Sequence, residues 1–140
     1  MKLALAFIMI LVLMLGGCPS GSTTPPATTP IATTTTTGQT AGQLSSAGQA
    51  VFSTRCAGCH GSSGQGVTAP AVIGASAGLT KYATAQGLFN YISANMPGNA
   101  PGSLSQQQYL EVTAYLLVQN NLVAASALLG LGLLGGISLS

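Results

Sequence analysis

The side chains of this chain that could do chemistry lie together in one short segment. Residues 56–60 read Cys-Ala-Gly-Cys-His, so two thiols stand three positions apart and an imidazole follows at once. His60 is the only histidine and Glu111 the only acid in the 140 residues, which excludes acid–base catalysis by paired carboxylates. The net charge of +2 gives no basic surface, so we expect no nucleic-acid partner.

The spacing of Cys56, Cys59 and His60 is the C-x-x-C-H pattern of covalent haem c attachment. Such thiols can bond the two vinyl groups of one porphyrin, and the adjacent imidazole becomes the proximal iron ligand. A structural zinc site needs four ligands, and the chain adds only Cys18 to these three. A thioredoxin-like pair needs a preceding strand, whereas residues 45–55 are predicted to be helical. We therefore expect one covalent haem c with its iron.

Residues 1–17 have the layout of a secretory signal peptide, with a basic residue before an apolar run that is too short to span a bilayer comfortably. The Leu-Gly-Gly-Cys sequence that ends at Cys18 resembles a bacterial lipobox. This resemblance implies a lipidated Cys18 and an exported protein held at a membrane, on the periplasmic or cell-surface side. The alternative is an ordinary signal peptide that leaves Cys18 as a free thiol, a liability in an oxidising compartment.

Residues 18–44 are predicted to form a disordered tether. Thr, Pro, Gly, Ser and Ala dominate the segment, which includes five consecutive threonines at 33–37 and has almost nothing apolar to bury. A flexible coil of about 25 residues spans roughly 25–30 Å. The tether either lets the following domain swing between partners or only holds it clear of the membrane.

The iron of a haem bound at this motif needs a ligand on its other face. Candidates outside the signal peptide are Met96, Lys81, a water molecule or nothing. Pro97 disfavours helix at the residue before it, so Met96 is expected just past the end of a helix over residues 88–95. We expect Met96 to ligate the iron. Ligation by His60 and Met96 raises the reduction potential and leaves no open position for a substrate.

The patterns around the motif predict an all-α fold. Ser46 is expected to cap a helix that runs through Phe52. Ser105, with a glutamine three residues later, resembles a capping box that opens a helix to about Asn120. No run alternates cleanly enough to predict a strand. Helices packed around one haem are therefore expected over residues 45–121, with the haem supplying much of the core.

Residues 45–118 resemble a class I, monohaem cytochrome c domain. Besides the motif at 56–60, the matching stretches are GQAVF at 48–52, APAVIG at 69–74, MPGNAPGSLS at 96–105 and YLEVTAYLL at 109–117. The resemblance implies a small cytochrome c fold in which Gly48 and Phe52 of the first helix cross Tyr115 of the last. It also implies that the carbonyl group of Pro70 accepts a hydrogen bond from the proximal imidazole.

Residues 122–140 form an uncharged, apolar tail that is long enough to span a membrane. Four glycines between 130 and 136 and the lack of basic or aromatic flanks argue against a span. Similar cytochrome domains often carry a C-terminal extension that wraps back over the helices, which is the arrangement we expect. Insertion into a membrane or a partner is the alternative.

These features predict an electron-transfer protein, not an enzyme, in a respiratory or dehydrogenase chain outside the cytoplasmic membrane. Its partners would be a dehydrogenase, an oxidase or another cytochrome, and a subunit role in an oxidoreductase complex is equally compatible. Because only 3% of residues are charged, docking should depend weakly on salt. The alternatives are a haem enzyme or a gas or redox sensor with an open sixth iron position, and a structural metal-binding lipoprotein without haem.

Overall fold

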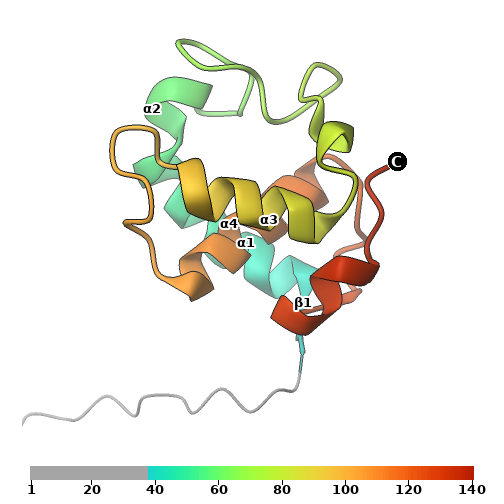
Figure 1. Ribbon diagram of the computed structural model, residues 1–140. Coiled ribbons are helices and arrows are strands. Elements are labelled where there is room, and N and C mark those ends of the chain that lie inside the picture. Colours follow the sequence, from blue (N-terminus) through green and yellow to red (C-terminus); the bar gives the residue numbers. More distant parts are fainter. Residues whose placement is uncertain (1–37) are drawn as a thin grey trace, which may run out of the picture. The chain divides into compact units, whose positions relative to one another are not determined.

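The computed structural model describes residues 38–140, which fold mainly into helices (Figure 1). The predicted signal peptide, Cys18 and the tether as far as residue 37 lie outside the described residues. The helices, which include two 3₁₀ segments named η1 and η2, are α1 Ala41–Arg55, α2 Ala57–His60, η1 Leu79–Tyr82, α3 Ala85–Asn95, α4 Gln106–Gln119 and η2 Leu131–Gly136. The predicted all-α fold is confirmed for this part of the chain.

The first helix begins earlier than the sequence predicted. Thr40, not Ser46, is its N-cap: the Thr40 hydroxyl accepts a hydrogen bond from the Gln43 backbone N–H at 3.3 Å, and the Gln43 side chain accepts one from the Thr40 N–H at 2.9 Å. The Ser46 hydroxyl instead donates to the Gly42 carbonyl inside the helix. A reciprocal capping box satisfies two helix N–H groups that would otherwise lack partners. Residues 39–44, assigned above to the tether, therefore belong to the folded domain.

The last helix begins where its capping box predicted. The Ser105 hydroxyl accepts from the Gln108 N–H at 3.2 Å, and the Gln108 side chain accepts from the Ser105 N–H at 2.9 Å. The helix that follows buries a broad apolar face, made of Tyr109, Leu110, Val112, Ala114, Tyr115, Leu116 and Leu117. This face makes α4 the central element of the core.

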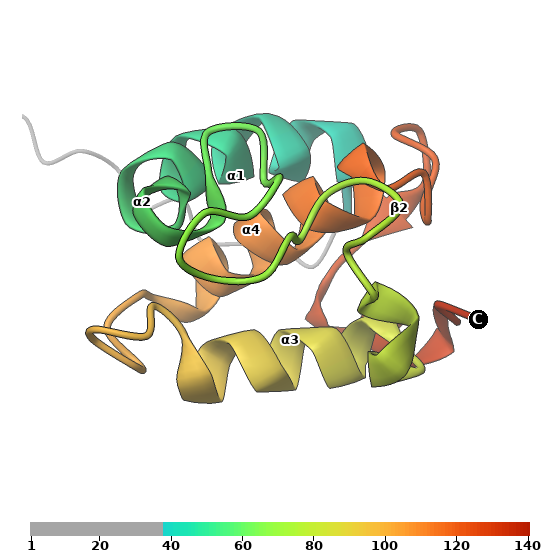
Figure 2. The same cartoon turned by 90° about the horizontal axis from the view of Figure 1, so that it is seen from above.

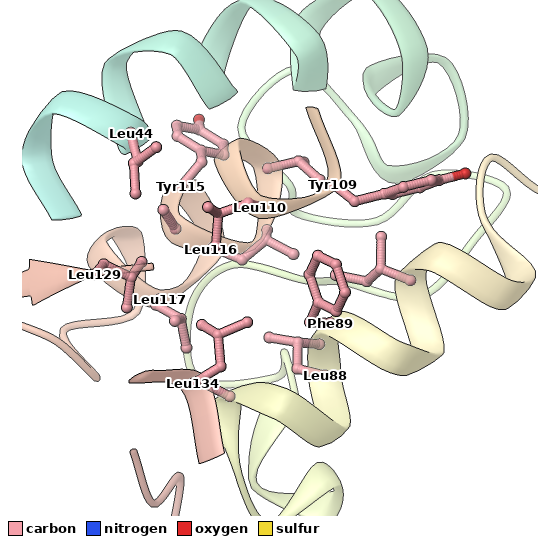
Figure 3. Packing of buried hydrophobic residues seen from close by; sticks show 14 of the residues in the cluster. Leu44, Leu88, Phe89, Tyr109, Leu110, Tyr115, Leu116, Leu117, Leu129 and Leu134 are labelled. Carbon is pink, nitrogen blue, oxygen red and sulfur yellow. The ribbon is translucent and has the colours of Figure 1, made fainter. Parts of the chain in front are cut away.

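Helix α4 lies between α1 and α3 (Figure 2). It crosses α1 at Gly48, where a methyl group in place of hydrogen would overlap the Glu111 carbonyl and lie 3.0 Å from Tyr115 Cβ. Glycine is needed here because any side chain would push the two backbones apart. On the other side of α4, Leu88 and Phe89 of α3 enter the same buried cluster as Leu116 (Figure 3).

Residues 122–140, the apolar tail, pack onto the helices. The structure therefore shows the extension that wraps back over the domain, which was the expected arrangement. Its β2 strand, Leu128–Leu129, pairs antiparallel with β1, Gln39–Thr40. This two-stranded ribbon was not predicted, because two residues are too few for an alternating pattern to be visible. Further along, Leu134 and Leu139 are buried. Within residues 38–140 no helix is long and apolar enough to cross a membrane.

Candidate functional site

The two cysteines of the motif lie at the junction of α1 and α2. Cys56 ends α1, with its N–H donating to the Phe52 carbonyl, and it also precedes α2. The Cys56 carbonyl then accepts from the Cys59 and His60 N–H groups at 3.1 and 3.0 Å. Because one turn of helix separates the two thiols, both lie at the same end of α1. Cys56 is half-buried, whereas Cys59 is exposed.

The two thiols differ in their surroundings. Burial raises the pKa of the Cys56 thiol above its ordinary value of 9.0, and the neighbouring Cys59 acts in the same direction. The Arg55 guanidinium opposes this effect by favouring the thiolate. Before the haem is attached, burial is the largest of these influences and favours the protonated thiol; in the haem-loaded protein the Cys56 sulfur is a thioether and does not titrate.

The imidazole of His60 is held by the loop that follows it. His60 Nδ1 lies 2.7 Å from the Pro70 carbonyl oxygen. A carbonyl oxygen can only accept, so Nδ1 carries the proton and the Nε2 lone pair is left for a metal. This contact is the one that the resemblance implied for Pro70. A carbonyl acceptor of this kind fixes the ring orientation and raises the basicity of a ligating histidine.

Met96 follows directly after the last residue of α3, as Pro97 predicted. Its backbone is extended, with φ −121° and ψ 153°, and its N–H still donates to the Ile92 carbonyl at 2.9 Å. The helix itself begins at Ala85, capped by Thr84, which is earlier than the start at residue 88 that the sequence predicted. Met96 is half-buried and packs against the core.

These residues share one cavity of about 360 Å³. Its lining includes both cysteines, His60, Pro70 and Met96, and its apolar walls come from Phe52, Val72, Leu79, Leu88, Ile92, Val112 and Leu116. Two thiols, an imidazole with a free Nε2 and a thioether around an apolar space fit the chemistry of a covalently bound haem. Lys81, the other candidate ligand, also lines the cavity, but its Nζ lies over the Tyr82 ring, 5.0 Å from the ring centroid.

The family model described as "Cytochrome C oxidase, cbb3-type, subunit III" matches residues 43–116, which is more than half of the chain. The chain belongs to this family. Membership of a cytochrome c family means that the cofactor is a covalently bound haem c with its iron, and it implies electron transfer through that haem. The matched segment includes most of α1, the C-x-x-C-H motif, Met96 and most of α4.

Among solved structures, the crystal structure of the sulfane dehydrogenase SoxCD from Paracoccus pantotrophus contains a similar chain. The TM-score is 0.57, with 25% sequence identity over 66% of this cytochrome c chain and 51% of that chain. This chain therefore spans about half the length of its structural relative. The match agrees with the small cytochrome c fold predicted from the sequence. Among curated proteins, no sequence matches this chain.

Sequence reasoning missed two side chains that shape the site. The Tyr109 hydroxyl lies against the backbone of Met96, and the Asn120 side chain bonds the loop that carries Pro70. From the sequence, Tyr109 belongs only to the stretch at 109–117 that resembles the cytochrome c domain, and Asn120 only marks the end of the last helix. In each case the polar atoms act on segments far away in the sequence, which no local pattern reveals.

Proposed function

We propose that this cytochrome c domain is a single-electron carrier in which His60 and Met96 would ligate the iron of one haem c. When bound, the haem iron takes up and releases one electron. Cys56 and Cys59 would hold the group covalently, and the backbone carbonyl of Pro70 would orient the imidazole of His60 that ligates the iron. The observation that carries the proposal is that both sulfur attachment sites, His60 and Met96 line one cavity.

A thioether on the sixth position would leave no site for a substrate or a gas. This is why we favour an electron carrier over a haem enzyme or a sensor. The half-buried position of Met96 at an extended helix end supports ligation, because its backbone is held by α3 while its side chain remains on the cavity wall. Lys81 is less suited, since its ammonium group already contacts an aromatic face.

The decisive experiment compares the optical spectra of the haem-loaded protein and its Met96→Ala variant. The oxidised wild type should show the weak far-red band of a thioether–iron(III) bond, and the variant should lose it. Asn99→Ala, an exposed change in the same loop and cavity lining, should keep the band. A high-spin wild-type spectrum, or one that Met96→Ala leaves unchanged, would favour the haem enzyme or sensor.

We further propose that the protein works outside the cytoplasmic membrane, anchored through a lipidated Cys18, and exchanges electrons with a dehydrogenase. The dehydrogenase is preferred over an oxidase or another cytochrome because the similar solved chain comes from a structure described as a sulfane dehydrogenase. Mass spectrometry of the membrane-extracted protein should find acyl groups on residue 18, and Cys18→Ala should release the protein from membranes. Retention of the variant at the membrane would contradict the anchor.

A further inference from the structure

Both ends of the loop from Met96 to Leu104 are hydrogen-bonded to one phenol group, that of Tyr109. The Tyr109 hydroxyl donates to the Met96 carbonyl at 2.7 Å. The same oxygen accepts from the Leu104 N–H at 3.4 Å, so a single atom closes the loop. Figure 3 shows this hydroxyl pointing out of the apolar cluster toward the segment that follows α3.

The position of this hydroxyl is determined by the core. The Tyr109 ring is only 4% exposed, and it lies in the first turns of α4, just after the Ser105 capping box. Its backbone carbonyl also accepts from the buried Thr113 hydroxyl at 2.7 Å. Because the ring has almost no freedom to move, the phenol oxygen is a fixed point for the loop, and not a group that follows it.

A second side chain, which comes from α1, holds the same loop. Arg55, the last residue of α1, donates from its guanidinium to the Ser103 hydroxyl at 2.9 Å. Arg55 directly precedes Cys56, so this contact links the C-terminal part of the Met96 loop to the start of the haem-attachment segment, residues 56–60. The loop that begins at Met96 is thus held by one side chain from α4 and by one from α1.

We propose that Tyr109 is the positioning residue for the axial thioether, with the Arg55–Ser103 contact in support. The phenol fixes the backbone of Met96, and the fixed backbone keeps the side chain aimed into the cavity. Tyr109 does not ligate the iron. Its hydroxyl acts by lowering the fraction of time in which the thioether is displaced, which keeps the sixth position closed to external ligands. This inference rests on the proposed ligation by Met96.

The test is an imidazole titration of the oxidised, haem-loaded full chain, followed through the far-red band. Tyr109→Phe keeps the buried ring and removes only the hydroxyl. Loss of hydrogen bonds of ordinary strength should raise the apparent affinity for imidazole by roughly tenfold. The reduction potential should fall as well, because the thioether raises it. Tyr115→Phe makes the same chemical change on the same helix, away from the loop, and should leave both readouts at their wild-type values.

The outcomes separate this inference from the proposed function. If Met96→Ala removes the band but Tyr109→Phe binds imidazole like the wild type, Met96 is the ligand and the positioning role is wrong. If the wild type has no thioether band, both proposals fail together. A Tyr109→Phe protein that only unfolds more easily, with unchanged imidazole affinity and potential, would likewise reduce Tyr109 to a structural residue.

A second variant covers the case in which Tyr109→Phe does not retain haem. Ser103→Ala removes the Arg55 contact at an exposed position, so the fold should tolerate it. We expect a rise in imidazole affinity of about two- to threefold, smaller than for Tyr109→Phe, since Ser103 lies at the far end of the loop from Met96. Ser53→Ala, the same chemical change at an exposed serine of α1 that does not line the cavity, is its control. Equal affinities for Ser103→Ala and the wild type would overturn the role of this contact.

Discussion

The ring of Phe52 in α1 packs on the ring of Tyr115 in α4, with the centroids 5.2 Å apart and the planes tilted by 42°. Tilted aromatic pairs at this distance are favourable beyond the area they bury. Phe52 also lines the cavity that contains the cysteines and His60. The same side chain therefore fixes the crossing of the two helices and forms a wall of the haem site.

Gly48 permits this crossing, and its replacement is the most direct test of the helix packing. Gly48→Ala would place a methyl group against the Glu111 carbonyl, so α1 and α4 would have to separate. We predict a loss of about 2–3 kcal/mol in the free energy of unfolding, measured by denaturant titration of the haem-loaded protein. Gly58→Ala is a matched control, because a methyl group on this helical glycine meets nothing within 4 Å. Equal stability of the two variants would contradict the close packing.

Only some of the leucines in the C-terminal extension, residues 122–140, are buried in the core. Leu134 is fully buried, whereas the adjacent Leu133 is 49% exposed. Leu134→Ala should lower the free energy of unfolding by about 2–4 kcal/mol, because it leaves a cavity. Leu133→Ala should change it by no more than about 0.5 kcal/mol. If both changes had equally small effects in denaturant unfolding, the extension would not be part of the folded core in solution.

Stability at high pH should depend on Tyr82. Burial raises the pKa of Tyr82 above its ordinary value of 10.0, while Lys81 acts in the opposite direction. The folded state holds the phenol proton more tightly than the unfolded chain. This contribution to stability is therefore complete below about pH 10 and is lost as the pH rises through the folded-state pKa.

Urea unfolding at a series of pH values measures this dependence. Tyr82→Phe should flatten the decline in stability at high pH. Lys81→Gln should steepen it, because it removes an influence that lowers the pKa of Tyr82. Identical pH profiles for the wild type and Tyr82→Phe would show that the phenol has the same pKa in both states.

The elements predicted correctly are those whose signals are local. The C-x-x-C-H spacing identified the haem motif, Pro97 indicated the end of α3 at Met96, and the serine of the α4 capping box indicated the start of that helix. Each signal lies within a few residues of the feature it predicts. Helix–helix and ligand-loop contacts, in contrast, depend on side chains that are far apart in the sequence.

The start of α1 shows why the other features escaped. Thr40 lies beyond a run of threonines, where composition predicts a tether, and it is held in place by pairing with Leu128 in the tail. Further along, the Ala85 N–H donates to the Ile137 carbonyl and the Leu139 N–H to the Ala83 carbonyl, which fastens the same tail beside α3. These backbone contacts carry no side-chain pattern, so only the folded structure reveals them.

The side chain of Asn120 also makes contacts with residues far away in the sequence, which no local pattern reveals. Its Nδ2 donates to the Val72 carbonyl at 3.0 Å and to the Leu116 carbonyl at 2.8 Å, while its Oδ1 accepts from the Gly74 N–H at 3.0 Å. One amide thus fastens the loop after Pro70 to the end of α4. That loop supplies the acceptor for His60, so loosening it should affect the proximal side of the haem.

We predict that Asn120→Ala lowers the free energy of unfolding by about 1–3 kcal/mol, because the part-buried Val72 carbonyl loses its donor and the Gly74 N–H loses its acceptor. Asn120→Asp keeps the acceptor but loses both donor contacts, so it should not restore wild-type stability. Gln119→Ala, an exposed change one residue earlier, should have almost no effect. Denaturant unfolding measures stability, and the exchange rate of the His60 Nδ1 proton, followed by NMR in the reduced protein, reports on the loop. Faster exchange in Asn120→Ala alone would locate the effect at the His60–Pro70 contact, whereas unchanged exchange and stability would show that Asn120 does not hold the loop.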